Sequence, residues 1–171
     1  MKALPKITYM GILTTLAIVM TRFVQIPLSF IPNFNDRISL GFLPVALAGS
    51  LFGPFSGGIV AGAEDLIRAL LFPQGDINLL FTLNAAIRGT IYGLLLKEMN
   101  VKNIIIASII IFVLNNTFII SGIISIYFGV PFYTAVLSKV GVSAVNCIVQ
   151  TVLLIFTGIP IERKLRYVRK Q

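Results

Sequence analysis

The sequence contains no histidine, a single cysteine and few charged residues, and each shortage excludes a class of function. Without histidine the chain has no carrier for imidazole acid/base catalysis or for a histidine zinc site. Cys147 stands alone, which excludes an internal disulfide and a cysteine-rich metal cluster. No phosphate-cradling glycine motif and no nucleophile beside a base can be identified. We therefore expect a protein that is not an enzyme and that has no metal site and no cofactor.

Charged residues make up 12% of the chain, about half of the roughly 25% found in soluble domains. Mean hydropathy is +0.95 and 57% of the residues are hydrophobic. Because apolar stretches recur along nearly the whole sequence, we predict one transmembrane domain over residues 1–171, embedded in the lipid bilayer. A net charge of +8 would also suit a nucleic-acid-binding protein, but here it predicts basic cytoplasmic flanks and no nucleic acid partner.

Six apolar stretches predict an all-α bundle of six transmembrane helices, since buried helices can be shorter than the roughly 20 residues of an isolated span. They run from Ile7 to Thr21, Ile38 to Phe52, Phe55 to Phe72, Leu79 to Leu96, Ile104 to Phe128, and Phe132 to Ile159. The first stretch has no small-residue cleavage site, so we expect a permanent span and no signal peptide. Lysines and arginines gather on one side of such a bundle, which predicts a plasma-membrane protein with both termini cytoplasmic.

The segment FVQIPLSFIPNFND between the first two spans predicts a long outer loop. Pro27 and Pro32 each lack a donor N–H and restrict the residue before them, so a continuous helix is disfavoured. The segment is also unusually apolar for a loop. It is consistent with a lid over a cavity between the helices, and equally with an interfacial segment that covers helix ends.

Several charged side chains lie inside the predicted spans, where an ionised group costs about 2.5–3.5 kcal/mol. In the third span, we expect Glu64 and Arg68 to form a local ion pair near the outer end, while Asp65 points toward a cavity. In the fourth span, Asn84 and Arg88 are four residues apart and share a helical face. Arg88 has no acid within one turn of it, so we expect its counter-charge to come from Asp65 or from an anionic ligand.

Polar groups converging among apolar helices favour a binding protein for a small organic solute. An ion channel would show an acidic ring or a filter sequence, and a stand-alone secondary transporter would usually show two inverted halves. Neither pattern is present, so a partner that supplies energy is expected, and a solitary small-solute permease is the alternative. Gly11 and Thr15 give the first span a small-residue surface, suited either to docking of another helix or to packing within the bundle.

Four pieces of the sequence, densest from Arg37 to Leu96, resemble the S component of energy-coupling factor (ECF) transporters, and most closely its folate-specific branch. They are R-x-S-x-G-F-x-P from Arg37, the L-F-G-P turn, A-x-D-L-x-x-A-L-L-F-P with Asp65, and F-T-L-x-A-A-x-R-G-x-I-Y-G with Arg88. The resemblance implies a high-affinity folate-binding subunit that works with a transmembrane coupling protein and two ABC-type ATPases. S components for thiamine, riboflavin or pantothenate share the fold and are the alternative.

The resemblance also implies roles for individual residues. Gly11 and Thr15 occupy the surface by which the first helix docks on the coupling protein, where alanines are commoner. Lys139 lies where an arginine is expected, and Glu64 replaces a small or apolar residue. The residues that we predict to bind the substrate are Arg22, Arg37, Asp65, Asn84, Arg88, Asn116 and Lys139.

A pterin ring calls for donors and acceptors along its edge, and a glutamate tail calls for cations. We therefore predict that Asn84 and Arg88 form the centre of the site, with the loop from Phe23 to Arg37 closing over it. Asn115, Asn116, Asn146 and Gln150 are also consistent with hydrogen bonds that merely join helices.

Overall fold

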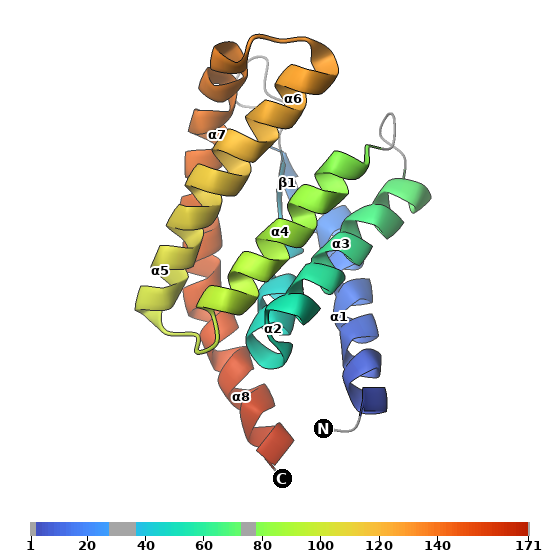
Figure 1. The fold of residues 1–171 in the computed structure, drawn as a ribbon. Coiled ribbons are helices and arrows are strands. Elements are labelled where there is room, and N and C mark those ends of the chain that lie inside the picture. The colour runs from blue at the N-terminus through green and yellow to red at the C-terminus, as the bar shows by residue number, and fades with distance from the viewer. Residues whose placement is uncertain (1–2, 28–36, 73–77, 171) are drawn as a thin grey trace.

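Helices dominate the structure, a computed structural model that describes residues 3–27, 37–72 and 78–170 (Figure 1). Within these residues, six continuous helical segments form an all-α bundle, as predicted. They are α1 (Ala3–Phe23), α2 (Phe42–Phe52), α3 (Pro54–Leu71), α4 (Leu79–Leu95), α5 (Val101–Ile110) continued by the π-helix η1 (Ile111–Ile119) and by α6 (Ile120–Phe128), and α7 (Phe132–Leu153) continued by η2 (Leu154–Gly158) and α8 (Ile159–Lys170).

Two of the helical segments are long and apolar enough to cross a bilayer by themselves. They cover Val101–Phe128 and Phe132–Leu165, with 28 and 34 residues. By contrast, α2 has 11 residues, which rise only about 16 Å. Residues Phe42 to Ser50 of α2 are all buried, so neighbouring helices rather than lipid surround it. The short second span is therefore an inner helix of the bundle.

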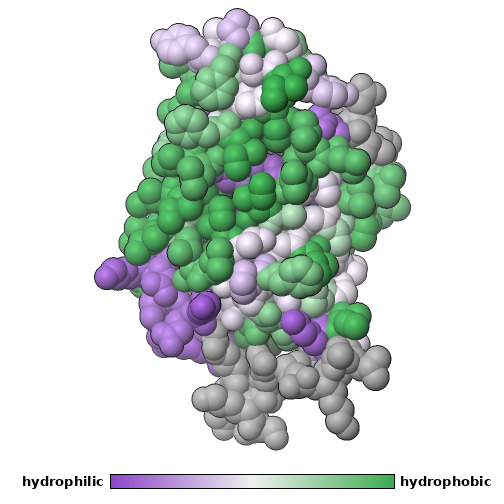
Figure 2. Space-filling view, in the orientation of Figure 1, coloured by the Kyte–Doolittle hydropathy of each residue, from purple (hydrophilic) through white to green (hydrophobic). Residues whose placement is uncertain are grey.

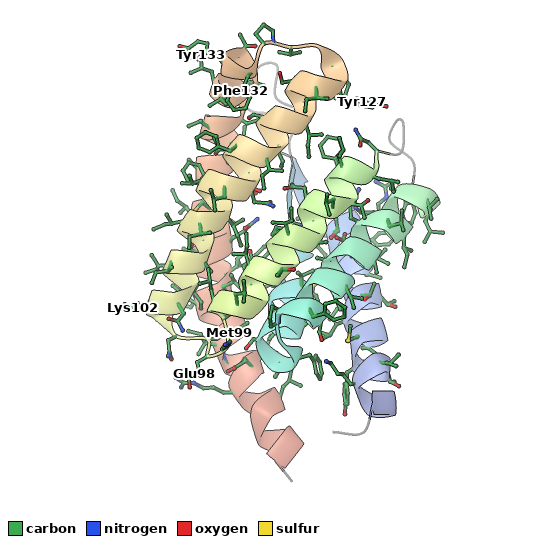
Figure 3. All side chains as sticks on the ribbon, viewed as in Figure 1. Glu98, Met99, Lys102, Tyr127, Phe132 and Tyr133 are labelled. Atoms are coloured by element: carbon green, nitrogen blue, oxygen red, sulfur yellow. The ribbon has the colours of Figure 1, made fainter. Side chains whose placement is uncertain are left out.

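The two ends of the bundle differ in the connections they carry. The start of α1, the end of α8 and the α4–α5 connection lie at one end, and the α6–α7 connection lies at the other (Figure 1). Glu98, Met99 and Lys102 mark the first end, while Tyr127, Phe132 and Tyr133 mark the second (Figure 3). Between the ends the visible surface is largely hydrophobic (Figure 2). This arrangement is the one expected of an even number of membrane-spanning helices.

Two predicted boundaries are wrong because segments pair or pack in ways the sequence pattern does not reveal. The second helix begins at Phe42 instead of Ile38, because the preceding residues form strand β2 (Arg37–Ser39), which pairs antiparallel with β1 (Gln25–Pro27). Residues 28–36 of the predicted lid lie outside the described residues. The last helix continues beyond Ile159 as α8 to Lys170.

The π-helix η1 interrupts the fifth span at the residues IFVLNNTFI. The Thr117 hydroxyl donates to the Phe112 carbonyl, five residues back, at 2.8 Å, as the wider turn of a π-helix allows. Because a π-helix has more residues per turn than an α-helix, it changes the face on which each following side chain lies. Asn115 is fully buried as a result, with 0% of its surface exposed.

Gly49, Gly57, Gly89 and Gly93 form a seam along which the backbones of α2, α3 and α4 touch. A Cβ atom on Gly57 would lie 2.9 Å from the Gly49 Cα and would overlap the Gly89 carbonyl oxygen. A Cβ atom on Gly49 would lie 2.7 Å from the Gly93 nitrogen. The second and third spans therefore pack closely, and the glycine seam extends this packing to the fourth span.

The glycine seam generates a first prediction. Gly89→Ala should lower the free energy of unfolding by about 1–3 kcal/mol, because its methyl group has to push α3 and α4 apart at the Gly57 carbonyl. Thermal unfolding of the detergent-solubilised protein measures the effect. Gly122→Ala is the matched control, since a Cβ atom there meets nothing within 4 Å. Equal melting temperatures for the two variants would contradict the prediction.

Candidate substrate-binding site

Asp65 accepts two hydrogen bonds, one within α3 and one from α4. One carboxylate oxygen accepts a short hydrogen bond from the Arg68 guanidinium, one turn further along α3. The other accepts from the Thr82 hydroxyl of α4 at 2.9 Å. Both oxygens therefore have partners within the protein. The sequence-based expectation that Asp65 holds Arg88 is not what the structure shows, since Asp65 binds Arg68 instead.

Glu64 is the buried carboxylate of the pair, with 3% of its surface exposed. Its Oε1 lies 3.5 Å from the Arg68 Nε, and the Thr21 hydroxyl of α1 hydrogen-bonds its carboxylate. It also lies within range for direct Coulomb attraction to Arg88 of α4. Glu64 does pair with Arg68, but it faces the interior and not the rim of the bundle. Between Glu64 and Asp65, it is Glu64 that lies toward Arg88.

The phase of α3 explains this difference from the expectation. Gly57, Val60, Ala61 and Glu64 are all buried, and their spacing places them on one stripe of the helix. The glycine of that stripe meets α4 directly, so the whole stripe turns inward and carries Glu64 with it. The sequence contained this signal, because small and apolar residues at these intervals point to a buried face.

The charges of α3 and α4 balance. Two carboxylates and two guanidiniums, those of Glu64, Asp65, Arg68 and Arg88, sum to a formal charge of zero. Arg68 forms ion pairs with both carboxylates of α3. The Arg88 Nε atom is buried and has no hydrogen-bond partner in this part of the chain. Glu64 therefore compensates the charge of Arg88, whose Nε donor no described residue uses.

Asn84 of α4 is buried and is held by Asn115 of η1. The Asn115 amide nitrogen donates to the Asn84 Oδ1 at 2.7 Å and to the Asn84 backbone oxygen at 3.0 Å. Asn115 was not among the predicted site residues, although two adjacent asparagines inside an apolar span were a signal for it. Which of the two faces α4 depends on the π-helical turn.

Tyr92 is a second residue that the sequence prediction missed. It lies one turn beyond Arg88 on α4, and none of its surface is exposed. Its hydroxyl donates to the Gln150 Oε1 of α7 at 3.3 Å. Gln150 therefore forms a hydrogen bond that joins two helices, which is one of the roles expected of it from the sequence. Together with Asn84, Tyr92 links α4 to the long helices on its other side.

The remaining predicted binding residues lie around this centre. The Arg22 guanidinium is 5.0 Å from the centre of the Phe72 ring, which brings the end of α1 to the end of α3. The backbone oxygen of Asn116 accepts from Ser143 of α7 at 3.5 Å, and Lys139 is half-buried on α7. Arg37 opens strand β2, where only its backbone position is described.

Polar groups reach the surface on one hydrophobic face of the molecule. Figure 2 shows hydrophilic atoms at the bottom of an opening between α4 and the continuous helix α5–η1–α6. Hydrophobic atoms border this opening on all visible sides. A polar interior framed by apolar helices is the arrangement expected of a solute-binding site within a membrane protein.

Gly11 and Thr15 lie on an open face of α1. Both residues are exposed, and a Cβ atom on Gly11 would meet nothing within 4 Å. The Thr15 hydroxyl donates to the Gly11 carbonyl at 3.1 Å, so it is satisfied within its own helix. Gly11 and Thr15 therefore do not pack against another helix of the described bundle, which was one of the two roles considered for them.

The link between Asp65 and α4 generates a second prediction. Thr82→Val keeps the shape of the side chain and removes the only donor from α4 to Asp65 among the described residues, so the free energy of unfolding should fall by about 0.6–1.7 kcal/mol. Thr90→Val is the control, because the Thr90 hydroxyl donates to the Ala86 carbonyl of its own helix. Thermal unfolding in detergent compares them, and an equal loss in both variants would count against the bridge.

Comparison with known proteins identifies the family. The family described as "ECF-type riboflavin transporter, S component" matches residues 2–166. The chain is 40% identical over 118 residues to a protein named Folate transporter FolT from Clostridium novyi (strain NT). That alignment covers 68% of this chain and 66% of the relative, slightly under two thirds of its length.

Solved structures show the same fold. A crystal structure of FolT bound with folic acid matches with a TM-score of 0.75 and 30% identity, over 89% of this chain and 91% of that chain. The S component for biotin from an ECF-type ABC transporter matches with a TM-score of 0.66 and 24% identity, over 96% and 92% of the two chains. With the family match spanning nearly the whole sequence, the chain belongs to the S components of ECF-type transporters.

Proposed function

We propose that this chain is the folate-binding S component of an ECF-type importer. It captures folate outside the cell and delivers it together with a transmembrane coupling protein and two ABC-type ATPases. The observation that carries the proposal is the likeness to FolT bound with folic acid, at 30% identity over 89% of this chain. Riboflavin is the second candidate, because the description of the matching family names it.

The charges of the site favour folate over riboflavin. The α3–α4 cluster is formally neutral, so it suits an uncharged heterocycle bound by hydrogen bonds. Arg22, Arg37 and Lys139 add positive charge beyond this cluster. Folate carries two carboxylates on its glutamate tail, which these cations can attract, whereas riboflavin offers them no anionic group.

The same proposal covers the placement of the chain in the cell. Lys97 and Lys102 flank the α4–α5 connection, which lies at the same end as the start of α1 and the end of α8 (Figure 1). Basic residues favour the cytoplasmic side, so both termini are cytoplasmic and the α6–α7 end faces outward. The chain acts as one transmembrane substrate-binding domain of the plasma membrane and has no catalytic role.

The open face of α1 supports a docking role for Gly11 and Thr15. Small side chains let a second helix approach closely, and no part of the described bundle covers this position. The coupling protein is the partner that the proposed function supplies for it.

A third prediction concerns Arg88. Arg88→Gln keeps most of the side-chain volume and removes the guanidinium donors, so the dissociation constant for folic acid should rise by about tenfold or more. Quenching of tyrosine fluorescence reports binding, since the chain has five tyrosines and no tryptophan. Arg163 is exposed and lies on α8, so the control variant Arg163→Gln should leave the affinity for folic acid unchanged.

The same titrations separate the two candidate ligands. Wild-type affinity for folic acid in the Arg88→Gln variant, with an unchanged melting temperature, would remove Arg88 from the binding site. Wild-type protein that binds riboflavin more tightly than folic acid would replace the proposed substrate. Mass spectrometry of the ligand retained after purification gives an independent answer.

A fourth prediction concerns docking. Gly11→Leu should abolish co-purification with the coupling protein and the ATPases while leaving the affinity for folic acid unchanged, because the new side chain blocks only the outer face of α1. Gly141→Leu is the matched control, since this glycine is also exposed and also faces open space. An intact complex in the Gly11→Leu variant, or equal loss in both, would refute the assignment of this surface.

A further inference from the structure

The contact between Asn115 and Asn84 fixes the orientation of both amide groups. A backbone carbonyl only accepts hydrogen bonds, so the Asn115 atom 3.0 Å from the Asn84 backbone oxygen must be its amide nitrogen. The same nitrogen lies 2.7 Å from the Asn84 side chain, and the atom that it meets there must therefore be the acceptor Oδ1. Asn84 consequently turns its amide nitrogen away from Asn115.

This orientation makes α4 a surface of hydrogen-bond donors. The Asn84 Oδ1 faces Asn115 and accepts from it, so the polar group that Asn84 turns away from Asn115 is its NH₂. One turn along the same face, Arg88 adds a guanidinium, which has donors and no acceptor. In a low-dielectric interior a donor facing another donor costs far more than it would in water. The ligand edge that meets this face should therefore consist of acceptors.

Asn115 itself is placed at a cost to the fold. It is completely buried, and its own Oδ1 has no hydrogen-bond partner among the described residues. A buried acceptor without a partner is destabilising, so helix joining alone is a poor reason for an asparagine here. The π-helical segment η1 is a second observation, because π-helices are rare and are frequently found at functional sites.

We propose that Asn115 is a positioning residue, which holds the Asn84 amide with its NH₂ turned toward the ligand and thereby favours a ligand edge made of acceptors. The inference rests on the proposed folate function. In a pterin the matching edge is formed by the C4 carbonyl oxygen and the ring nitrogen N5. Asn115 acts through Asn84 and does not touch the ligand.

Folic acid and aminopterin test this assignment, because aminopterin carries an amino group in place of the C4 oxygen. Calorimetric titration of the wild-type protein should give an affinity for folic acid on the order of tenfold higher than for aminopterin. Asn115→Leu removes the group that orients Asn84 at similar volume, so the amide can rotate and the ratio should fall toward one. Because both ligands are measured on the same variant, a general loss of stability cancels in the ratio.

A second variant and a control keep the test decisive. Asn84→Asp replaces the donor by an acceptor and should shift the ratio toward aminopterin, and it carries the test if Asn115→Leu does not fold. Thr117→Val on the same π-helix should keep the wild-type ratio, since the Thr117 hydroxyl binds its own helix.

The outcomes distinguish this inference from the proposed function. Wild-type protein that binds neither folic acid nor aminopterin would overturn the proposed function and the inference with it. Wild-type protein that binds folic acid and aminopterin equally well would overturn the inference alone. So would variants at Asn115 and Asn84 that keep the wild-type ratio of the two affinities.

Discussion

The contact between the backbones of α3 and α4 is the constraint on which the rest of the structure depends. The two helices run antiparallel, and their register can be followed along the glycine seam. Pro54 meets Gly93, Gly57 meets Gly89, Gly62 meets Ala86, and Asp65 meets Thr82. Because the backbones touch, neither helix can rotate or slide without a clash. The seam therefore determines which polar side chains of α3 face α4.

The buried charges depend on this register. Glu64 reaches Arg88 and Arg68, and Asp65 reaches Arg68 and Thr82, so the two carboxylates and two guanidiniums compensate one another. Isolated charges in a membrane interior are costly, and a neutral cluster lowers that cost. The cluster also leaves the Arg88 Nε donor without a partner among the described residues, so a charged group lies inside the bundle with hydrogen-bonding capacity that the protein does not use.

Much of the fold could be predicted from the sequence, because hydropathy alone indicates the spans and the small residues indicate close packing. The exchange of Glu64 and Asp65 could not be predicted from their spacing, since both reach Arg68 and only the phase of α3 against α4 separates them. Strand β2 depends on a partner more than ten residues away, and three residues give too short a pattern to recognise. The pairing of Asn115 with Asn84 could not be predicted for a similar reason, because a π-helix changes the face that an α-helical pattern predicts.

The position of the site follows from the way the two parts of the bundle meet along α4. Toward the end of the bundle that carries the α4–α5 connection, the contact is apolar, with Leu96 and Met99 packed in one core cluster with Ile104 and Leu154. Further along α4, hydrogen bonds of Tyr92 with Gln150 and of Asn84 with Asn115 take over. Such hydrogen bonds are worth only about 0.6 kcal/mol each in a membrane, far less than the apolar and backbone packing elsewhere. The junction is therefore closed by apolar packing at one end and by polar side chains at the other, which is the end where Asn84 and Arg88 lie together on α4.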